Sequence, residues 1–179
     1  MSSTNRGGIR EIQDRYMTPT WCIDLIMDKI IPARDFSDCG EWKYFLEPCK
    51  GTGNIYNHPK LENYIKNYAE LDLDIDYLDP EFDTDADLII TNPPFSKALE
   101  FLEKSLSCDW ATVIYLMRLN FLGSQKRKEF WNLHRPSHLY VLSKRPSFTD
   151  NGNTDSTEYA WFCFQKSTLM IDPPGIYVL

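Results

Sequence analysis

The sequence predicts a doubly wound α/β fold whose sheet is mostly parallel. Short apolar runs alternate with segments of helical spacing, which is the pattern of strands joined by crossover helices. The apolar run at residues 88–91 has the character of a strand buried on both faces of a parallel sheet. Two late strands follow each other without a helix between them, which favours an antiparallel hairpin at the C-terminal end. We therefore expect helices on both faces of the sheet.

The individual elements are expected in the following order. Thr18 and Pro19 predict the start of a helix, with Thr18 as its N-cap, and apolar residues recur at helical spacing until Pro32. A second helix is expected at residues 96–106, where leucines lie on one side and charged residues on the other, and a short third helix at 125–131. Strands are expected at residues 44–47, about 64–71, 88–91, 111–117, 138–142 and 158–164.

Composition sets limits on the function. The chain has 179 residues, the length of one domain with a sizeable core. It contains no apolar stretch of membrane-spanning length, and its polar start lacks a signal-peptide core, so a cytoplasmic location is expected. The 5 cysteines are widely spaced without a C-x-x-C pair, and the histidines share no metal-ligand spacing. We therefore expect free thiols and no metal site.

The charges of the chain are unevenly distributed. The net charge is −7, which is unfavourable for a partner of nucleic acid. Acidic residues cluster at residues 62–87, whereas basic residues cluster at 118–145. A polyanion could therefore meet a basic face on an acidic protein. For the run Lys126, Arg127 and Lys128, a solvated helix surface is an equally good interpretation.

The tetrapeptide Asn92-Pro93-Pro94-Phe95 directly follows the buried strand and predicts an active site. Two prolines fix the backbone and remove two N–H donors, so this segment offers rigid acceptors. Such acceptors suit a ligand that carries an NH2 group. Phe95 adds an apolar face on which a planar group could stack. Termination of a strand by prolines is the structural alternative.

A second segment, at residues 47–53, has the pattern Glu-Pro-x-x-Gly-x-Gly and predicts a glycine turn between a strand and a helix start. Gly51 and Gly53 let the backbone approach a ligand closely. Cys49 lies inside this turn, where its small side chain is suited to a position near a ligand.

Together the glycine turn and Asn92-Pro93-Pro94-Phe95 resemble the S-adenosylmethionine-dependent amino-methyltransferases, in particular the DNA adenine-N6 methyltransferases. The order of the motifs resembles the gamma class of that family, in a compact, phage-like form. The resemblance implies a Rossmann-like methyltransferase sheet, a flexible N-terminal segment at residues 1–15 and a single catalytic domain at residues 16–179. It also implies S-adenosylmethionine as the cofactor and DNA adenine as the substrate.

The resemblance also implies roles for single residues. In the family, the motif matched by Tyr16, Thr18 and Pro19 packs against the methionine moiety of the cofactor. Glu70 would bind the ribose hydroxyls. Asp72, two positions further along the sequence, is the alternative ribose ligand. Asp76, followed by Tyr77, would accept a hydrogen bond from the adenine amine of the cofactor. The remaining cofactor-binding residues implied by the motifs are Glu47, Pro48, Cys49, Gly51, Gly53 and Asn92.

The expected chemistry needs little acid–base machinery. Asn92 and the Pro93 carbonyl would accept the two N–H groups of the target amine, which directs its lone pair toward the methyl carbon. Phe95 would stack on the target base after that base rotates out of the helix. Phe148 could pack on the same base or serve as a loop hydrophobe. The expected substrate-binding residues are Phe95, Lys126, Arg127, Lys128, Arg145 and Phe148.

The substrate leaves alternatives open. Gamma-class enzymes usually carry a separate target-recognition domain, which is not evident in this sequence, so loops or a partner subunit would supply sequence specificity. Asn-Pro-Pro-aromatic motifs also occur in methyltransferases that act on exocyclic amines of RNA or on protein glutamine. A catalytically silent cofactor-binding subunit of a larger assembly is a further alternative.

Overall fold

The computed structural model describes residues 17–30, 44–70, 75–108, 110–148, 154, 156–165 and 170–179. Its helices are α1 (Thr20–Met27), α2 (Ala98–Ser107) and α3 (Lys128–Leu133), with short 3-10 turns at Pro59–Leu61, Leu119–Leu122 and Gln125–Arg127. Its strands are β1 (Tyr44–Glu47), β2 (Ile65–Tyr68), β3 (Ala86–Thr91), β4 (Trp110–Arg118), β5 (His138–Val141), β6 (Tyr159–Gln165) and β7 (Gly175–Val178).

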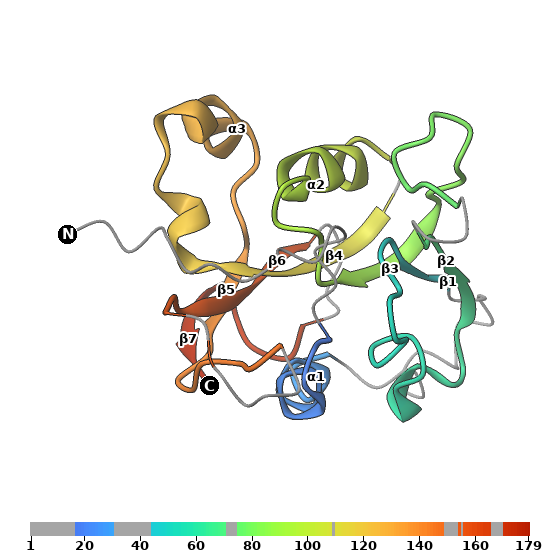
Figure 1. The fold of residues 1–179 in the computed structure, drawn as a ribbon, viewed down its shortest axis with the longest axis horizontal. Helices are drawn as coiled ribbons and strands as arrows, with labels where there is room; N and C mark the ends of the chain where they lie inside the picture. Colours follow the sequence, from blue (N-terminus) through green and yellow to red (C-terminus); the bar gives the residue numbers. More distant parts are fainter. Residues whose placement is uncertain are drawn as a thin grey trace, which may run out of the picture.

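The strands form one seven-stranded sheet in the order β2-β1-β3-β4-β6-β5-β7. Strand β6 runs antiparallel to β4 and β5, whereas the other neighbouring strands pair in parallel. This arrangement confirms the expected mostly parallel sheet with a late antiparallel pair. Figure 1 shows α1 on one side of the sheet and α2 with α3 on the other, which confirms the expected helices on both faces.

Two apolar layers hold the helices to the sheet. On one face, Ile23 and Ile26 of α1 pack in a buried cluster with sheet residues that include Ile90. On the opposite face, Phe101 of α2 and Phe130 of α3 belong to a second buried cluster. In β3, Leu88 and Ile90 belong to the first cluster and Ile89 to the second, since successive side chains of a strand point to opposite faces. The sheet is therefore covered on both sides, as its continuous apolar strands require.

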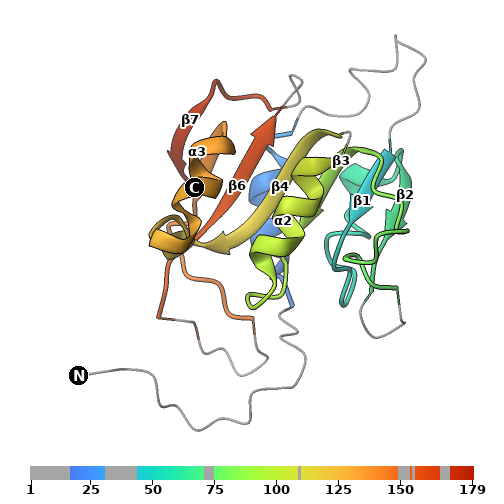
Figure 2. The same cartoon turned by 90° about the horizontal axis from the view of Figure 1, so that it is seen from above.

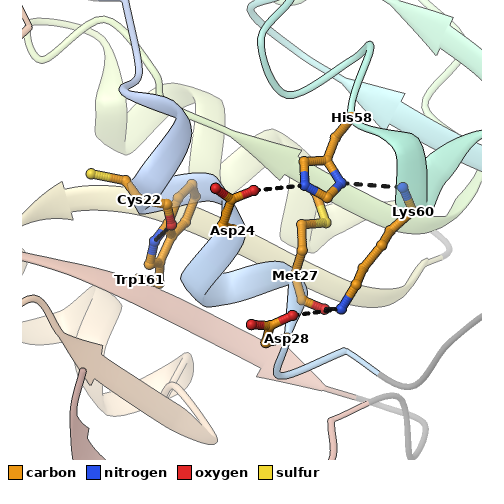
Figure 3. A network of polar contacts seen from close by, with 7 residues as sticks. All are labelled: Cys22, Asp24, Met27, Asp28, His58, Lys60 and Trp161. Carbon is orange, nitrogen blue, oxygen red and sulfur yellow. Dashed lines mark hydrogen bonds and ion pairs between the residues drawn. The ribbon is translucent and has the colours of Figure 1, made fainter.

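Polar contacts fix α1 in place (Figure 3). The Trp161 indole Nε1 donates a hydrogen bond to the Cys22 carbonyl at 3.1 Å, which joins the helix to β6. His58 Nε2 lies 3.2 Å from Asp24 Oδ1, and Lys60 Nζ donates to the end of the helix. The segment after the glycine turn is therefore tied to α1.

The structure corrects two sequence predictions. Helix α1 begins at Thr20 with Pro19 at its N-cap position and no side-chain cap, so the prediction of Thr18 as N-cap was wrong. Strand β7 was not predicted. It pairs in parallel with β5 at the outer edge of the sheet, so the β5–β6 pair is not the edge of the fold.

Other expectations concern absences. Cys22, Cys49, Cys108 and Cys163 form no disulfide among the described residues, as expected, whereas Cys39 lies outside the described residues. Within the described ranges, no helix combines the length and the apolar character needed to cross a bilayer. The segment expected to be flexible, residues 1–15, also lies outside the described part of the chain.

Candidate active site

Two of the predicted site residues, Glu47 and Asn92, lie at the carboxyl-terminal edge of the sheet. Strands β1, β3 and β4 are parallel, so their carboxyl ends lie at the same edge. Glu47 is the last residue of β1, Asn92 follows β3, and Arg118 ends β4. The connections after β1 and β5 lie on this side of the sheet in Figure 2. In open α/β sheets, ligands bind beyond this edge.

Thr18 connects the three predicted motifs. Its hydroxyl oxygen accepts a hydrogen bond from Asn92 Nδ2 at 3.1 Å. Its backbone carbonyl accepts one from Asn54 Nδ2, directly after the glycine turn, at 3.0 Å. Thr18 and Asn92 are buried, with 5% and 8% of their surface exposed. The structure therefore brings the Thr18-Pro19 segment, the glycine turn and Asn92 together.

The two prolines hold a fixed conformation after β3. Pro93 and Pro94 are buried. The Pro94 carbonyl accepts a hydrogen bond from the Lys97 backbone N–H at 3.0 Å, immediately before α2. The acceptor at the start of this helix is therefore the Pro94 carbonyl. The two acceptors predicted to bind the target amine are different atoms, namely the Pro93 carbonyl and the Asn92 amide oxygen. A ligand amine could engage them without unwinding α2.

The glycine turn has the conformation that its glycines predict. Gly51 and Gly53 have φ angles of +51° and +78°, in the left-handed region that favours glycine. A Cβ on Gly53 would lie 2.8 Å from Asn57 Nδ2, whereas a Cβ on Gly51 would meet no atom within 4 Å. Gly51 therefore exposes backbone toward open space, where a ligand could approach closely.

Glu47 is a buried acid beside this turn. Only 2% of its surface is exposed, and its Oε2 has no hydrogen-bond partner among the described residues. Burial raises the pKa of its carboxyl well above the usual range, the Tyr56 backbone N–H lowers it, and the charge of Glu70 raises it further. A cationic ligand group would supply the missing partner. The carboxyl thus fits the ammonium of an amino-acid moiety.

The predicted cofactor-binding residues that follow β2 differ in burial and in their hydrogen bonds. Glu70 and Asp76 are half-buried. Asp76 Oδ1 accepts a hydrogen bond from the Leu78 backbone N–H at 2.9 Å and so shapes its own turn. Tyr77 is fully buried, and its hydroxyl lies 2.7 Å from Ser105 Oγ. A ligand could therefore contact Tyr77 through its backbone, but not through its ring.

Three side chains, those of Phe148, Tyr159 and Arg118, cluster around Phe95. Its ring centroid lies 6.3 Å from that of Phe148 and 5.9 Å from that of Tyr159. The Arg118 guanidinium carbon lies 4.3 Å from the centre of the Phe95 ring. Phe148 is buried and packs edge-on against Tyr159. In this state, Phe148 is part of the protein interior rather than an exposed stacking surface.

The predicted basic residues lie on the connections after β4 and β5. Lys126 and Lys128 are exposed. Arg127 donates from Nε to the Phe121 carbonyl at 2.7 Å, so it helps to fold its own connection. Arg145 forms an ion pair with Glu158. The substrate-binding role of these basic residues stays a prediction.

Two predicted positions cannot be placed, and two other residues were missed. Tyr16 and Asp72 lie outside the described residues, so the choice between Glu70 and Asp72 stays open. Sequence reasoning did not select Arg118 or Tyr159. A signal for Arg118 exists in the sequence, because it is a charged residue at the end of an apolar strand. Among the described residues, no group of three or more His, Cys, Asp or Glu could hold a metal ion.

Comparison with known proteins gives the class of fold. No protein-family model and no curated protein matches the sequence. A structure from Listeria monocytogenes, described as a class I S-adenosylmethionine-dependent methyltransferase, matches with a TM-score of 0.61 and 14% identity over 96% of this chain and 67% of that one. A structure from Pyrococcus horikoshii, described as an RNA methyltransferase, also matches with a TM-score of 0.61, with 17% identity over 84% of this chain and 87% of that one. The chain therefore has the Rossmann-like fold of these methyltransferases.

Proposed function

We propose that the chain is an S-adenosylmethionine-dependent methyltransferase that modifies the N6 amine of adenine in DNA. The observation that carries the proposal is the pair of hydrogen bonds through Thr18. These bonds join the glycine turn and Asn92 into one site, as a transfer between two bound groups requires. The fold is consistent with this reaction, since the two similar structures named above are described as methyltransferases.

The residues present fit the cofactor. When bound, S-adenosylmethionine supplies a methyl group on a sulfonium, and its methionine end carries an ammonium. The buried Glu47 carboxyl would accept from that ammonium, and Gly51 leaves open space for close approach. Glu70 and Asp76, at the neighbouring strand end, would hold the ribose and the adenine of the cofactor, as the resemblance implies.

Asn92 and Pro93 would orient the substrate amine. An aromatic amine is a weak nucleophile because its lone pair is delocalised into the ring. Acceptors on both of its N–H groups favour a pyramidal nitrogen whose lone pair points toward the methyl carbon. The hydrogen bond from Asn92 Nδ2 to Thr18 fixes the plane of the amide and therefore the direction of its oxygen. Phe95 would stack on the base.

A second candidate function is methylation of an exocyclic amine in RNA. The similar structure from Pyrococcus horikoshii is described as an RNA methyltransferase. The acceptors at Asn92 and Pro93 recognise a planar NH2 group, which adenine and guanine present in either nucleic acid. A partner subunit that supplies sequence specificity is compatible with both candidates.

Transfer of a labelled methyl group tests the proposal. The purified protein is incubated with labelled cofactor and with separate pools of unmethylated DNA, RNA and a release-factor-like protein. Label is expected in DNA with the wild type and with Asn63→Ala, a matched change at an exposed turn, and not with Asn92→Ala. Label only in RNA would establish the second candidate, and cofactor binding without transfer to any pool would indicate a silent subunit. Sequencing of the labelled DNA then gives the modified base.

A further inference from the structure

The connection between β4 and β5, residues 119–137, concentrates positive charge. In a chain whose net charge is −7, it holds one acid, Glu129, against four basic residues, Lys126, Arg127, Lys128 and Arg135. The short turns that open the connection lie directly beyond the end of β4 in Figure 2. Arg118 ends β4, and its guanidinium carbon lies 4.3 Å from the Phe95 ring centre. A cationic segment of an acidic protein thus begins beside the proposed stacking residue.

Phe121 holds the start of this connection against α3. Its backbone carbonyl accepts hydrogen bonds from Arg127 Nε at 2.7 Å and from Trp131 Nε1 at 3.4 Å. The Arg127 guanidinium carbon lies 4.2 Å from the Phe121 ring centre, and the rings of Phe121 and Trp131 meet edge-on at 5.9 Å. The middle residue of the basic run therefore folds the connection, whereas the sequence predicted one substrate-binding role for all three.

This arrangement leaves one apolar side chain and two cations at the surface. Leu122 directly follows Phe121 at the end of a 3-10 turn, and 39% of its surface is exposed. Lys126 and Lys128, the chain neighbours of Arg127, are exposed. The turn spans only roughly 8 Å, so Leu122 stays close to the end of β4. The three side chains are therefore presented from a fixed base near the proposed target site.

A base that leaves a duplex creates a use for such side chains. Its departure opens a gap in the stack that is apolar above and below, and proteins insert apolar side chains between base steps. The phosphates on either side of the gap attract lysine side chains. In a single strand no second strand holds the neighbouring bases apart, so there is no comparable gap to fill.

We propose that this connection docks on double-stranded DNA, with Leu122 entering the gap left by the extruded adenine and with Lys126 and Lys128 contacting phosphates. This inference rests on the proposed function and names the duplex as the form of its substrate. Leu122 stabilises the state in which the base is extruded, and this state exists only in a duplex. The lysines contact the backbone, which carries no sequence information.

Methyl transfer to one DNA in two forms tests the role of Leu122. The full chain, in excess and loaded with labelled S-adenosylmethionine, is mixed with an unmethylated DNA fragment, either as the duplex or as its separated strands. Leu122→Ala should slow transfer to the duplex roughly tenfold, because less of the lost stacking is replaced. Transfer to the separated strands should stay at the wild-type rate, which also shows that the variant is folded.

Leu133→Ala serves as the matched control. Leu133 is 79% exposed and ends α3. It precedes β5, which begins at the opposite edge of the sheet because β4 and β5 both pair antiparallel with β6. This variant should transfer to both forms of DNA at the wild-type rate. Equal losses on the duplex in the two leucine variants would show a general effect of exposed apolar surface and overturn the inference.

Salt-dependent binding of a labelled duplex tests the two lysines, with the chain saturated with S-adenosylhomocysteine. The slope of log K against log salt should become shallower by about 0.9 in Lys126→Gln and in Lys128→Gln, and by about 1.8 in the double variant. Lys104→Gln is the control, because Lys104 lies in the last turn of α2, toward the opposite edge of the sheet. An unchanged slope in the double variant, or an equal change in Lys104→Gln, would refute the phosphate contacts.

The remaining outcomes separate the inference from the proposed function. If Leu122→Ala transfers to the duplex at the wild-type rate, the inference fails and the proposed function stands. Equal losses on both forms of DNA would assign Leu122 to the fold and also overturn the inference. If the wild type methylates the separated strands but not the duplex, adenine in DNA remains the substrate and duplex docking is excluded. Absence of transfer to either form by the wild type would overturn the proposed function, and the inference with it.

Discussion

The Thr18 hydroxyl accepts a hydrogen bond from the Asn92 side-chain nitrogen at 3.1 Å, across 74 positions of the sequence. Both residues are buried, so water does not readily replace this bond. Because the two polar atoms of an amide lie on opposite sides of its carbonyl carbon, the bond also determines where the amide oxygen points. Thr18 is therefore a positioning residue for the proposed amine-binding group.

Thr18→Val should reduce methyl transfer more than cofactor binding. Valine keeps the shape of threonine but removes the acceptor, which leaves a buried donor on Asn92. We expect a stability loss of about 1–3 kcal/mol and a decrease in kcat of roughly ten- to hundredfold, because the amide oxygen loses its fixed direction. Thr18→Ser should restore both values. Urea unfolding and single-turnover kinetics measure the effects, and an unchanged kcat would contradict this role.

Gly51→Ala should weaken cofactor binding while the fold persists. Its φ of +51° costs a non-glycine residue about 1–2 kcal/mol, and the added Cβ would occupy the open space proposed for the ligand. Gly123→Ala is the control, because Gly123 has a φ of −92° and its Cβ would make only an ordinary contact at 3.7 Å. Calorimetric titration with S-adenosylmethionine should show a loss of at least tenfold for Gly51→Ala alone. Equal affinities would place the ligand elsewhere.

The sequence predicted the parts of the fold that depend on local pattern. The apolar run ending at Thr91 and the leucine spacing of α2 are local signals, and both elements occur where expected. Strand β7 has no such signal. Ile176 and Val178 are largely exposed and only Tyr177 packs against the core, so β7 depends mainly on its backbone pairing with β5. Such pairing depends on tertiary structure, which a single sequence does not display.

The same distinction applies to the site. A threonine before a proline is a typical helix start, yet the hydroxyl of Thr18 binds Asn92, because the fold brings β3 close to the start of α1. For Tyr77, the resemblance indicated a cofactor residue, whereas its side chain packs under α2. Motifs therefore predicted the candidate site, but partners distant in sequence determine what each of these side chains contacts.

Tyr77→Phe should lower stability without changing cofactor affinity. Its hydroxyl lies 2.7 Å from Ser105 Oγ, which lies 2.7 Å from the Tyr115 hydroxyl, in a buried network. Loss of one member should cost about 1 kcal/mol of unfolding free energy. Tyr44→Phe, at a strand position that is 48% exposed, should cost less than half of that. A weaker binding constant for S-adenosylmethionine in Tyr77→Phe would instead show that the hydroxyl reaches the ligand.

Glu47→Gln should change the pH dependence of stability. Burial raises the pKa of the Glu47 carboxyl above its unfolded value of about 4.3, so the folded state favours the protonated form. The stability associated with that proton is fully present below about pH 4.3 and is lost as the pH rises through the folded pKa. Glutamine cannot ionise, so the variant does not show this loss of stability as the pH rises. The unfolding free energy of the wild type should therefore fall relative to that of Glu47→Gln as the pH rises above about 4.3, the unfolded pKa, toward the raised pKa of the folded state.

Urea unfolding at several pH values measures this difference, and Glu62→Gln, a change at an exposed position, should parallel the wild type throughout. The same buried carboxyl is the acceptor proposed for the ammonium of the cofactor. Glu47→Gln should therefore bind S-adenosylmethionine more weakly even where it gains stability relative to the wild type, because an amide offers no charge to the cation. Parallel stability profiles of Glu47→Gln and the wild type would show that Glu47 is ionised in the free protein, and unchanged cofactor affinity would remove it from the binding site.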